Sequence, residues 1–136
     1  MCVVAVDREG RICLVESYRH PFGQWFWALP GGGSEGGELI AASKRELAEE
    51  TGIVASKWLK LGRARVCNGL LTEYQTNVLA TEFEVQDFIQ REDETRNRRF
   101  VRLEEFDDMV ASGEINDNQS ITAVYMYKNW RNHTYS

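Results

Sequence analysis

A chain of 136 residues with 43% hydrophobic and 27% charged residues has the length and balance of one globular domain, and we expect a single domain over residues 1–136. The formal net charge of -5 argues against nucleic acid as a partner, because an acidic surface repels the phosphate backbone. No apolar run reaches the roughly 20 residues that cross a bilayer, and residues 1–6 lack the basic leader of a signal peptide. We therefore expect a cytoplasmic protein without membrane contact.

The first predicted elements are strands that lead into a helix. Residues 2–6 and 12–18 have the composition of strands and flank the turn-forming residues 7–10, which predicts a β-hairpin. An aromatic run at 25–27 then leads into three glycines at 31–33. Residues 39–51 are strong helix formers, and Gly52 stands where a left-handed C-cap belongs, so a helix is predicted there.

The second half of the chain predicts three more strands and two more helices. The strands are expected at 58–66, 74–85 and 100–103, and a helix at 104–112 ends before Gly113. Asp117 or Asn118 then caps a last helix. That helix is expected to turn one face inward, which carries Ile121, Val124 and Tyr125. Strands interleaved with helices in a compact chain favour an α/β fold of the α+β kind, a mixed sheet between helices in three α/β/α layers.

The cysteines predict neither a disulfide framework nor a zinc site. They are odd in number, widely spaced and without a CxxC pair. We interpret Cys2, Cys13 and Cys67 as buried thiols.

Three carboxylates on the predicted helix suggest chemistry. Glu46, Glu49 and Glu50 stand at i, i+3 and i+4, which places them on one face within one turn. Such a cluster is either a solvated surface, the commoner case, or a site for a hard divalent cation that offsets the repulsion. Arg45 directly before the cluster and the glycine-rich residues 31–38 before the helix favour the cation, since glycines let backbone approach a phosphate closely.

A longer motif surrounds these residues, and it resembles the box of the Nudix hydrolase family. The motif consists of Leu29-Pro30-Gly31-Gly32, then Glu35, Gly37-Glu38 and Arg45-Glu46-Leu47-Ala48-Glu49-Glu50-Thr51-Gly52-Ile53. Six residues separate Glu38 from Arg45 where the family has seven, so the box is one residue short and the role of Glu38 is open. The resemblance implies the Nudix fold and Mg²⁺-dependent hydrolysis of the diphosphate linkage of a small nucleotide substrate, with Mn²⁺ as the alternative ion.

The resemblance also implies a set of site residues. Those expected to hold the metal are Glu46, Glu49, Glu50 and the carbonyl of Gly31. Glu49 and Glu50 also count among the catalytic residues, with Arg45 orienting the glutamates through charge-assisted hydrogen bonds. Arg19, Gly32 and Gly33 are candidates to bind the substrate. Glu94, in the acidic residues 92–94, is the candidate general base, and a solvated acidic turn is the alternative for it.

Two segments outside the box narrow the substrate. Residues 16–21 and 109–117 resemble the ADP-ribose pyrophosphatase branch of the family, which implies ADP-ribose or a nucleotide sugar as the substrate. The box itself is equally typical of a nucleoside triphosphate pyrophosphohydrolase of the house-cleaning type. A non-catalytic nucleotide-sugar-binding module on the same fold is the third reading, made plausible by the shortened box. Monomer and homodimer both stay open.

Overall fold

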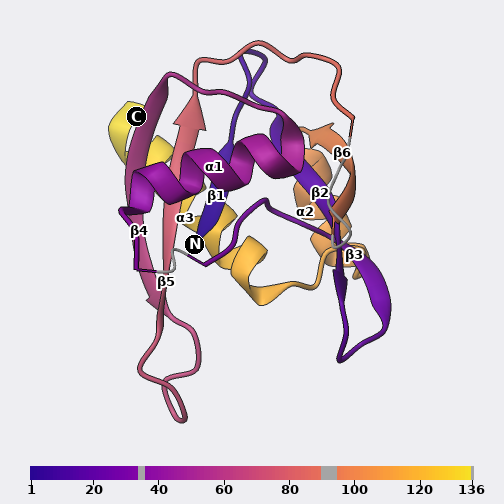
Figure 1. The fold of residues 1–136 in the computed structure, drawn as a ribbon, viewed down its shortest axis with the longest axis vertical. Helices are drawn as coiled ribbons and strands as arrows, with labels where there is room; N and C mark the ends of the chain where they lie inside the picture. Colours follow the sequence, from indigo (N-terminus) through magenta and orange to yellow (C-terminus); the bar gives the residue numbers. More distant parts are fainter. Residues whose placement is uncertain (34–35, 90–94, 136) are drawn as a thin grey trace.

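Six strands form two three-stranded sheets in the computed structural model, which describes residues 1–33, 36–89 and 95–135 (Figure 1). The first sheet has the order β1-β5-β4, with β1 parallel to β5 and β4 antiparallel to it. The second sheet has the order β3-β2-β6 and is antiparallel. The strands are β1 (Cys2–Ala5), β2 (Ile12–Arg19), β3 (Gln24–Ala28), β4 (Lys57–Arg65), β5 (Tyr74–Thr81) and β6 (Thr95–Val101).

The predicted hairpin of residues 2–6 and 12–18 is wrong, because the two strands belong to different sheets. β1 pairs with β5, and between the two predicted strands the described residues form only the isolated bridge from Val6 to Ile12. All four residues of β1 are buried, which is typical of a parallel strand covered on both faces. A hairpin strand with one solvent-exposed face would show polar residues at every second position.

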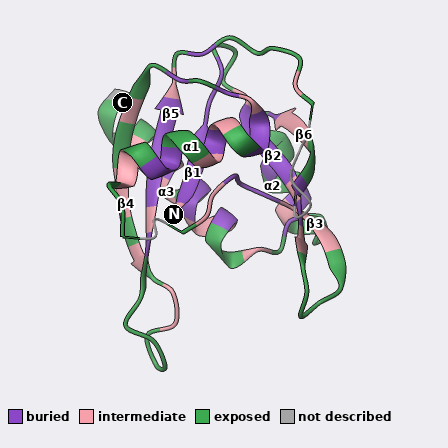
Figure 2. Ribbon diagram, viewed as in Figure 1, coloured by how far each residue is buried: buried purple, intermediate pink, exposed green. Residues whose placement is uncertain are grey.

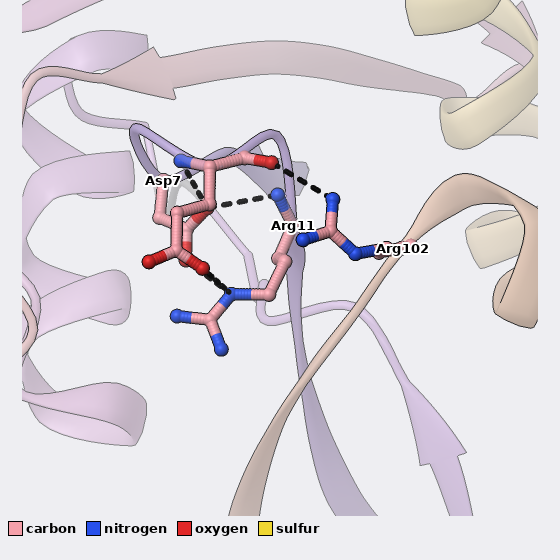
Figure 3. A network of polar contacts seen from close by, with 4 residues as sticks. Asp7, Arg11 and Arg102 are labelled. Atoms are coloured by element: carbon pink, nitrogen blue, oxygen red, sulfur yellow. Dashed lines mark hydrogen bonds and ion pairs between the residues drawn. The ribbon is translucent and has the colours of Figure 1, made fainter.

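A tight turn carries the chain from the first sheet to the second. The Asp7 carboxylate accepts hydrogen bonds from the backbone N–H groups of Glu9 and Arg11 at 3.0 and 2.8 Å, and from Arg11 Nε at 2.8 Å. Figure 3 shows Arg102, which precedes the second helix, reaching the same turn, where it donates to the Glu9 carbonyl. The turn is therefore held by its own carboxylate and by a distant element.

Helices cover both faces of the two sheets, as the predicted α/β/α layering requires. The helix α1 (Leu39–Thr51) crosses in front of them in Figure 1, while α2 (Leu103–Ser112) and α3 (Asn118–Tyr135) lie behind. Each face has its own hydrophobic core. One core joins Leu47 of α1 to buried residues of β1, β2 and β5, and the other joins α2 and α3 to the same strands. Figure 2 shows these strands buried between the helices.

The helix boundaries agree closely with the sequence. α1 spans the predicted residues and ends at Gly52, whose φ of 74° is left-handed, and α2 ends likewise at Gly113 with φ of 84°. Asp117 caps α3, because its carboxylate accepts from the backbone N–H of Ser120. On α3 the prediction is confirmed for Val124, which is buried, and for Ile121, which packs against the core, but it is wrong for Tyr125, which is 67% exposed. Ser120, Ala123 and Tyr127 complete the buried face.

Three smaller expectations are corrected. β6 begins at Thr95 and ends at Val101, earlier than the predicted strand 100–103, since its run of polar residues hides the strand pattern. β5 ends at Thr81, four residues before the predicted end. Cys67 is only partly buried, although the other two cysteines are buried as expected and all three are free. Among the described residues, no helix has the length and apolar character to cross a membrane.

Candidate functional site

A cleft of about 730 Å³ opens beside the second half of α1. Its walls come from the glycine loop 31–33, the end of β2, the start of β5 and the N-terminal end of α3. It brings together seven of the sequence-predicted site residues, namely Arg19, Gly31, Gly32, Gly33, Glu46, Glu49 and Glu50. Arg45 is not among the lining residues, and Glu94 lies outside the described residues.

The three carboxylates of α1 differ in how deeply they lie. Glu50 is buried, with 5% of its surface exposed, and its Oε2 accepts a hydrogen bond from the N–H of Gly31 at 3.3 Å. The Glu46 side chain is 19% exposed, and Glu49 is exposed at the rim. Glu50 is therefore the most buried of the three glutamates, Glu46 is intermediate, and Glu49 is the most exposed.

Two glycines of the loop lie close to other parts of the chain, Gly32 to the Glu46 carboxylate on α1 and Gly31 to the Met1 backbone. A Cβ on Gly32 would stand 2.8 Å from Cδ and 2.9 Å from Oε1 of Glu46. A Cβ on Gly31 would stand 2.2 Å from the carbonyl oxygen of Met1. Glycine is the residue that permits such approaches. The loop backbone and the Glu46 carboxylate are thus immediate neighbours.

The arginines sit at different distances from the carboxylates. Arg45 places Nη2 3.7 Å from Oε1 of Glu46, and half of its side chain is exposed. This separation is an ion pair but is too long for a hydrogen bond. Arg19 ends β2 and lines the same cleft. It is an arginine that shares the cleft with the α1 carboxylates.

Glu38 accounts for the short box, because it caps α1. Its carboxylate accepts hydrogen bonds from the N–H groups of Ile40 at 3.0 Å and Ala41 at 2.8 Å, and the helix starts at the next residue. These two bonds to the ionised form lower the pKa of Glu38 below its usual range. The side chain is exposed and is not among the residues that line the cleft. It thus takes the capping position that the missing residue leaves open.

Several polar residues of the cleft are not among the predicted site residues. Glu73, Gln75, Thr95, Ser17 and Asp117 all line it, and of these Asp117 is predicted only as a helix cap. Gln75 is buried and donates to Asn77 Oδ1 at 2.6 Å and to the Gln119 carbonyl at 3.0 Å. Two amides in a strand that continues as Val-Leu-Ala are a visible signal, since buried polar groups need a reason. Glu73 carried no comparable signal.

The thiol in the cleft is not a nucleophile. Cys2 lines the cleft, and burial raises its pKa to about 12, with the Asp117 carboxylate acting in the same direction. Burial likewise raises the pKa of Cys13 to about 12. Because the thiolate is the reactive form, both groups are inert near neutral pH.

The carboxylates also fit a divalent cation. Among the described residues no three His, Cys, Asp or Glu side chains converge closely enough to enclose a metal by themselves. Mg²⁺ does not require such a cage, since it typically takes one or two carboxylates and completes its shell with water and substrate oxygens. Glu46 and Glu50, which both approach the Gly31-Gly32 backbone, supply that partial set.

A second cavity, of about 690 Å³, lies elsewhere, between the start of β4 and the end of α3. Aromatic side chains of Trp58, Tyr127 and Trp130 contribute to its walls. It contains none of the residues that the sequence singles out for chemistry. The cleft beside α1 is therefore the candidate site.

Comparison with known proteins identifies the family of the chain. The family model of the NUDIX domain matches residues 1–123. An ADP-ribose pyrophosphatase of Bacillus subtilis is 32% identical over 127 residues, which cover 91% of this chain and 69% of the relative. An ADP-ribose pyrophosphatase of Mycobacterium tuberculosis is 39% identical over 85 residues, 60% of this chain and 40% of the relative. The chain thus spans well under half of that second protein.

Solved structures share the fold. The crystal structure of an ADP compounds hydrolase superposes with a TM-score of 0.82 at 18% identity, covering 98% of this chain and 74% of the other. A NUDIX hydrolase from Nitrosomonas europaea gives 0.68 at 20% identity, with 93% and 86% covered. The layered fold and the motif on α1 are both those expected from the sequence. The chain belongs to the NUDIX hydrolase family, whose members generally use divalent metal ions.

Proposed function

We propose that this chain hydrolyses the diphosphate linkage of a nucleoside diphosphate derivative, with ADP-ribose or a nucleotide sugar as the substrate and Mg²⁺ as the ion. The observation that carries the proposal is the cleft itself, in which three carboxylates of α1 face a glycine loop and Arg19. The two relatives named as ADP-ribose pyrophosphatases support the substrate class.

Glu46 and Glu50 hold the metal in this proposal, with Glu49 at the rim and the Gly31 carbonyl as a further ligand. The Gly31 N–H donates to Glu50, and in an extended residue the N–H and C=O groups point to the same side. The Gly31 carbonyl therefore faces the carboxylates. Mg²⁺ held there by Glu46 and Glu50 would offset the charge of the diphosphate oxygens and favour attack by water.

The remaining residues position the substrate and handle the proton. Arg19, which lines the cleft, binds a phosphate, and the backbone of Gly32 and Gly33 comes close to the diphosphate. Arg45 supports Glu46 from outside the cleft. Water adds to one phosphorus, the bridging P–O bond breaks, and two monophosphates leave. Glu94 is our candidate for the base that takes the proton from this water.

A phosphate-release screen tests the proposal. Purified protein is incubated with Mg²⁺ and ADP-ribose, nucleotide sugars or nucleoside triphosphates. Alkaline phosphatase then converts monophosphate products to phosphate, and inorganic pyrophosphatase reports diphosphate released from triphosphates. We expect the highest kcat/KM with ADP-ribose or a nucleotide sugar, and no turnover in EDTA. Faster diphosphate release from triphosphates would instead favour the house-cleaning activity, and binding without turnover would favour a nucleotide-sugar-binding module.

A further inference from the structure

Strand β6 contains a bulge that turns one arginine toward α1. Val15 of β2 stands opposite Arg98, but Glu16 stands opposite Arg96, so Asn97 is an extra residue. Its φ of 46° is left-handed, which is uncommon for a residue other than glycine and is best tolerated by Asn or Asp. Its side chain donates to Glu16 Oε1 at 2.8 Å. The bulge is thus held by a specific contact.

Because of the bulge, Arg96 and Arg98 lie on opposite faces of the strand. Residues two apart on a regular strand share a face. Here Arg96 pairs with Glu16 at 3.4 Å and lies over the Trp25 ring, whereas Arg98 turns to the face that α1 covers. Bulges that redirect a side chain are frequent next to active sites.

Arg98 binds the C-terminal end of α1. Its Nη1 donates to the carbonyl of Thr51 at 2.7 Å, and its Nη2 donates to the carbonyl of Gln86. Thr51 is the last residue of the helix and follows Glu50 directly. The last carbonyls of a helix lack intrahelical partners and attract a cation. One guanidinium therefore ties α1 both to the second sheet and to the segment after β5.

An aromatic contact closes the same end of α1. Gly52 caps the helix with φ of 74°, and a Cβ there would stand 2.4 Å from the ring of Phe88. The Arg98 guanidinium lies 5.9 Å from the centre of that ring and 5.8 Å from that of Phe100. The guanidinium is partly buried between two aromatic rings, where it has little freedom to move.

The hydrogen bond of Arg98 restricts sliding of α1 along its axis, which the hydrophobic core restricts only weakly. Leu47 anchors the middle of α1 in a hydrophobic core, and such contacts are non-directional, so they resist sliding along the helix axis only weakly. The hydrogen bond from Arg98 to Thr51 has a direction. The Glu50 bond to Gly31, at 3.3 Å, is already long, and a small shift of the helix would break it.

We infer that Arg98 is a positioning residue, which holds the end of α1 so that the carboxylate of Glu50 faces the Gly31 backbone in the geometry that binds the metal. The inference rests on the metal role that we propose for Glu50. Arg98 thus sets that geometry although it lies outside the box, on β6. Partners that orient metal ligands typically change metal affinity or activity by about 10- to 100-fold when mutated.

The test compares Arg98→Met with Arg99→Met. Arg99 is the adjacent arginine on the opposite face of β6, where it pairs with Glu105 and Glu114 at the surface. Binding of Mn²⁺ to the substrate-free protein is measured by electron paramagnetic resonance. The Mg²⁺ concentration for half-maximal rate and the KM for ADP-ribose at saturating metal are measured alongside.

We expect Arg98→Met to weaken Mn²⁺ binding about tenfold and to raise the Mg²⁺ requirement equally, with KM changed less than about twofold. Arg99→Met should bind Mn²⁺ like the wild type. Arg98→Lys should recover part of the loss, because an ammonium group can still donate to the Thr51 carbonyl. If Arg98→Met does not fold, Arg98→Gln carries the same expectation, since its shorter side chain does not reach that carbonyl.

Wild-type Mn²⁺ affinity in a folded Arg98→Met or Arg98→Gln protein would overturn the inference. So would an equal loss in Arg99→Met, which would point to general destabilisation. Failure of the proposed function looks different. If ADP-ribose is not cleaved but Mn²⁺ binding responds as expected, the substrate is wrong and the positioning role stands. If Glu50→Gln binds Mn²⁺ like the wild type, the proposed metal site is wrong, and this inference fails with it.

Discussion

Replacing Gly32 by alanine should lower activity while leaving stability almost unchanged. The new Cβ would stand 2.8 Å from Cδ and 2.9 Å from Oε1 of Glu46, and the next atom, Oε2, is 3.1 Å away. All three atoms belong to the far end of one flexible side chain, so the carboxylate can move aside while the backbone stays in place. The φ of Gly32 is not in the left-handed region, and alanine adds no backbone strain.

The displacement can be estimated from contact distances. Carbon atoms pack at about 3.5 Å, so the Glu46 carboxylate must retreat by roughly 0.7 Å. Metal ligands tolerate deviations of only about 0.2 Å, and misplacement by about 1 Å can reduce a rate about 100-fold. We therefore expect kcat/KM at limiting Mg²⁺ to fall about 10- to 100-fold, or about 1.4–2.7 kcal/mol. The free energy of unfolding should change by less than about 1 kcal/mol, because no backbone atom must move.

The assay is ADP-ribose hydrolysis as a function of Mg²⁺ concentration, with thermal unfolding measured on the same samples. Gly69→Ala is the matched control, since a Cβ there meets nothing within 4 Å. It should match the wild type in both measurements. A Gly32→Ala protein with unchanged Mg²⁺ dependence and rate would refute the argument that the loop and Glu46 must stay in register.

Three further predictions concern the cap, the base and the thiols. Glu38→Gln should reduce turnover far less than Glu50→Gln. The variant should also have a lower Tm than the wild type at pH 7, and this Tm difference should become smaller below about pH 4. The stability that a carboxylate of lowered pKa provides disappears as that group is protonated. Glu94→Gln should lower kcat more than it raises KM, since a base acts in the transition state. In the native protein at pH 8, an aromatic disulfide reagent should label Cys67 first, and the two buried thiols only after unfolding.

Each of these has its own contrary result. Equal losses of turnover in Glu38→Gln and Glu50→Gln would show that Glu38 acts in the cleft. Full rates in Glu94→Gln and in variants of its two acidic neighbours would assign the deprotonation to a group on α1. Rapid labelling of three thiols in the folded protein would contradict the burial of Cys2 and Cys13.

Local sequence signals predicted the helices well and one strand pairing badly. α1 and α2 could be placed because strong helix formers end at Gly52 and Gly113, whose left-handed conformations terminate a helix in any context. The hairpin prediction at residues 2–18 failed because turn residues predict a reversal but not the sheet that each strand joins. That choice depends on β5, which lies some 70 residues further along the chain.

The site shows the same division between local and distant information. The glutamates of α1 and the glycines of the loop could be found because their spacing is local and periodic. Arg98 could not, because its role depends on the bulge at Asn97 and on where the end of α1 lies in space. The capping role of Glu38 was within reach, since the shortened box places it directly before the helix.

The proposed metal role of Glu50 is tested by the rate of ADP-ribose hydrolysis by Glu50→Gln at saturating Mg²⁺, with the products separated by chromatography. Glu50 is the most buried of the α1 carboxylates and bonds to the glycine loop. We expect the wild type to yield two monophosphates and the folded variant to lose about 100-fold or more of kcat. A folded Glu50→Gln protein that turns over ADP-ribose at close to the wild-type rate would contradict that role.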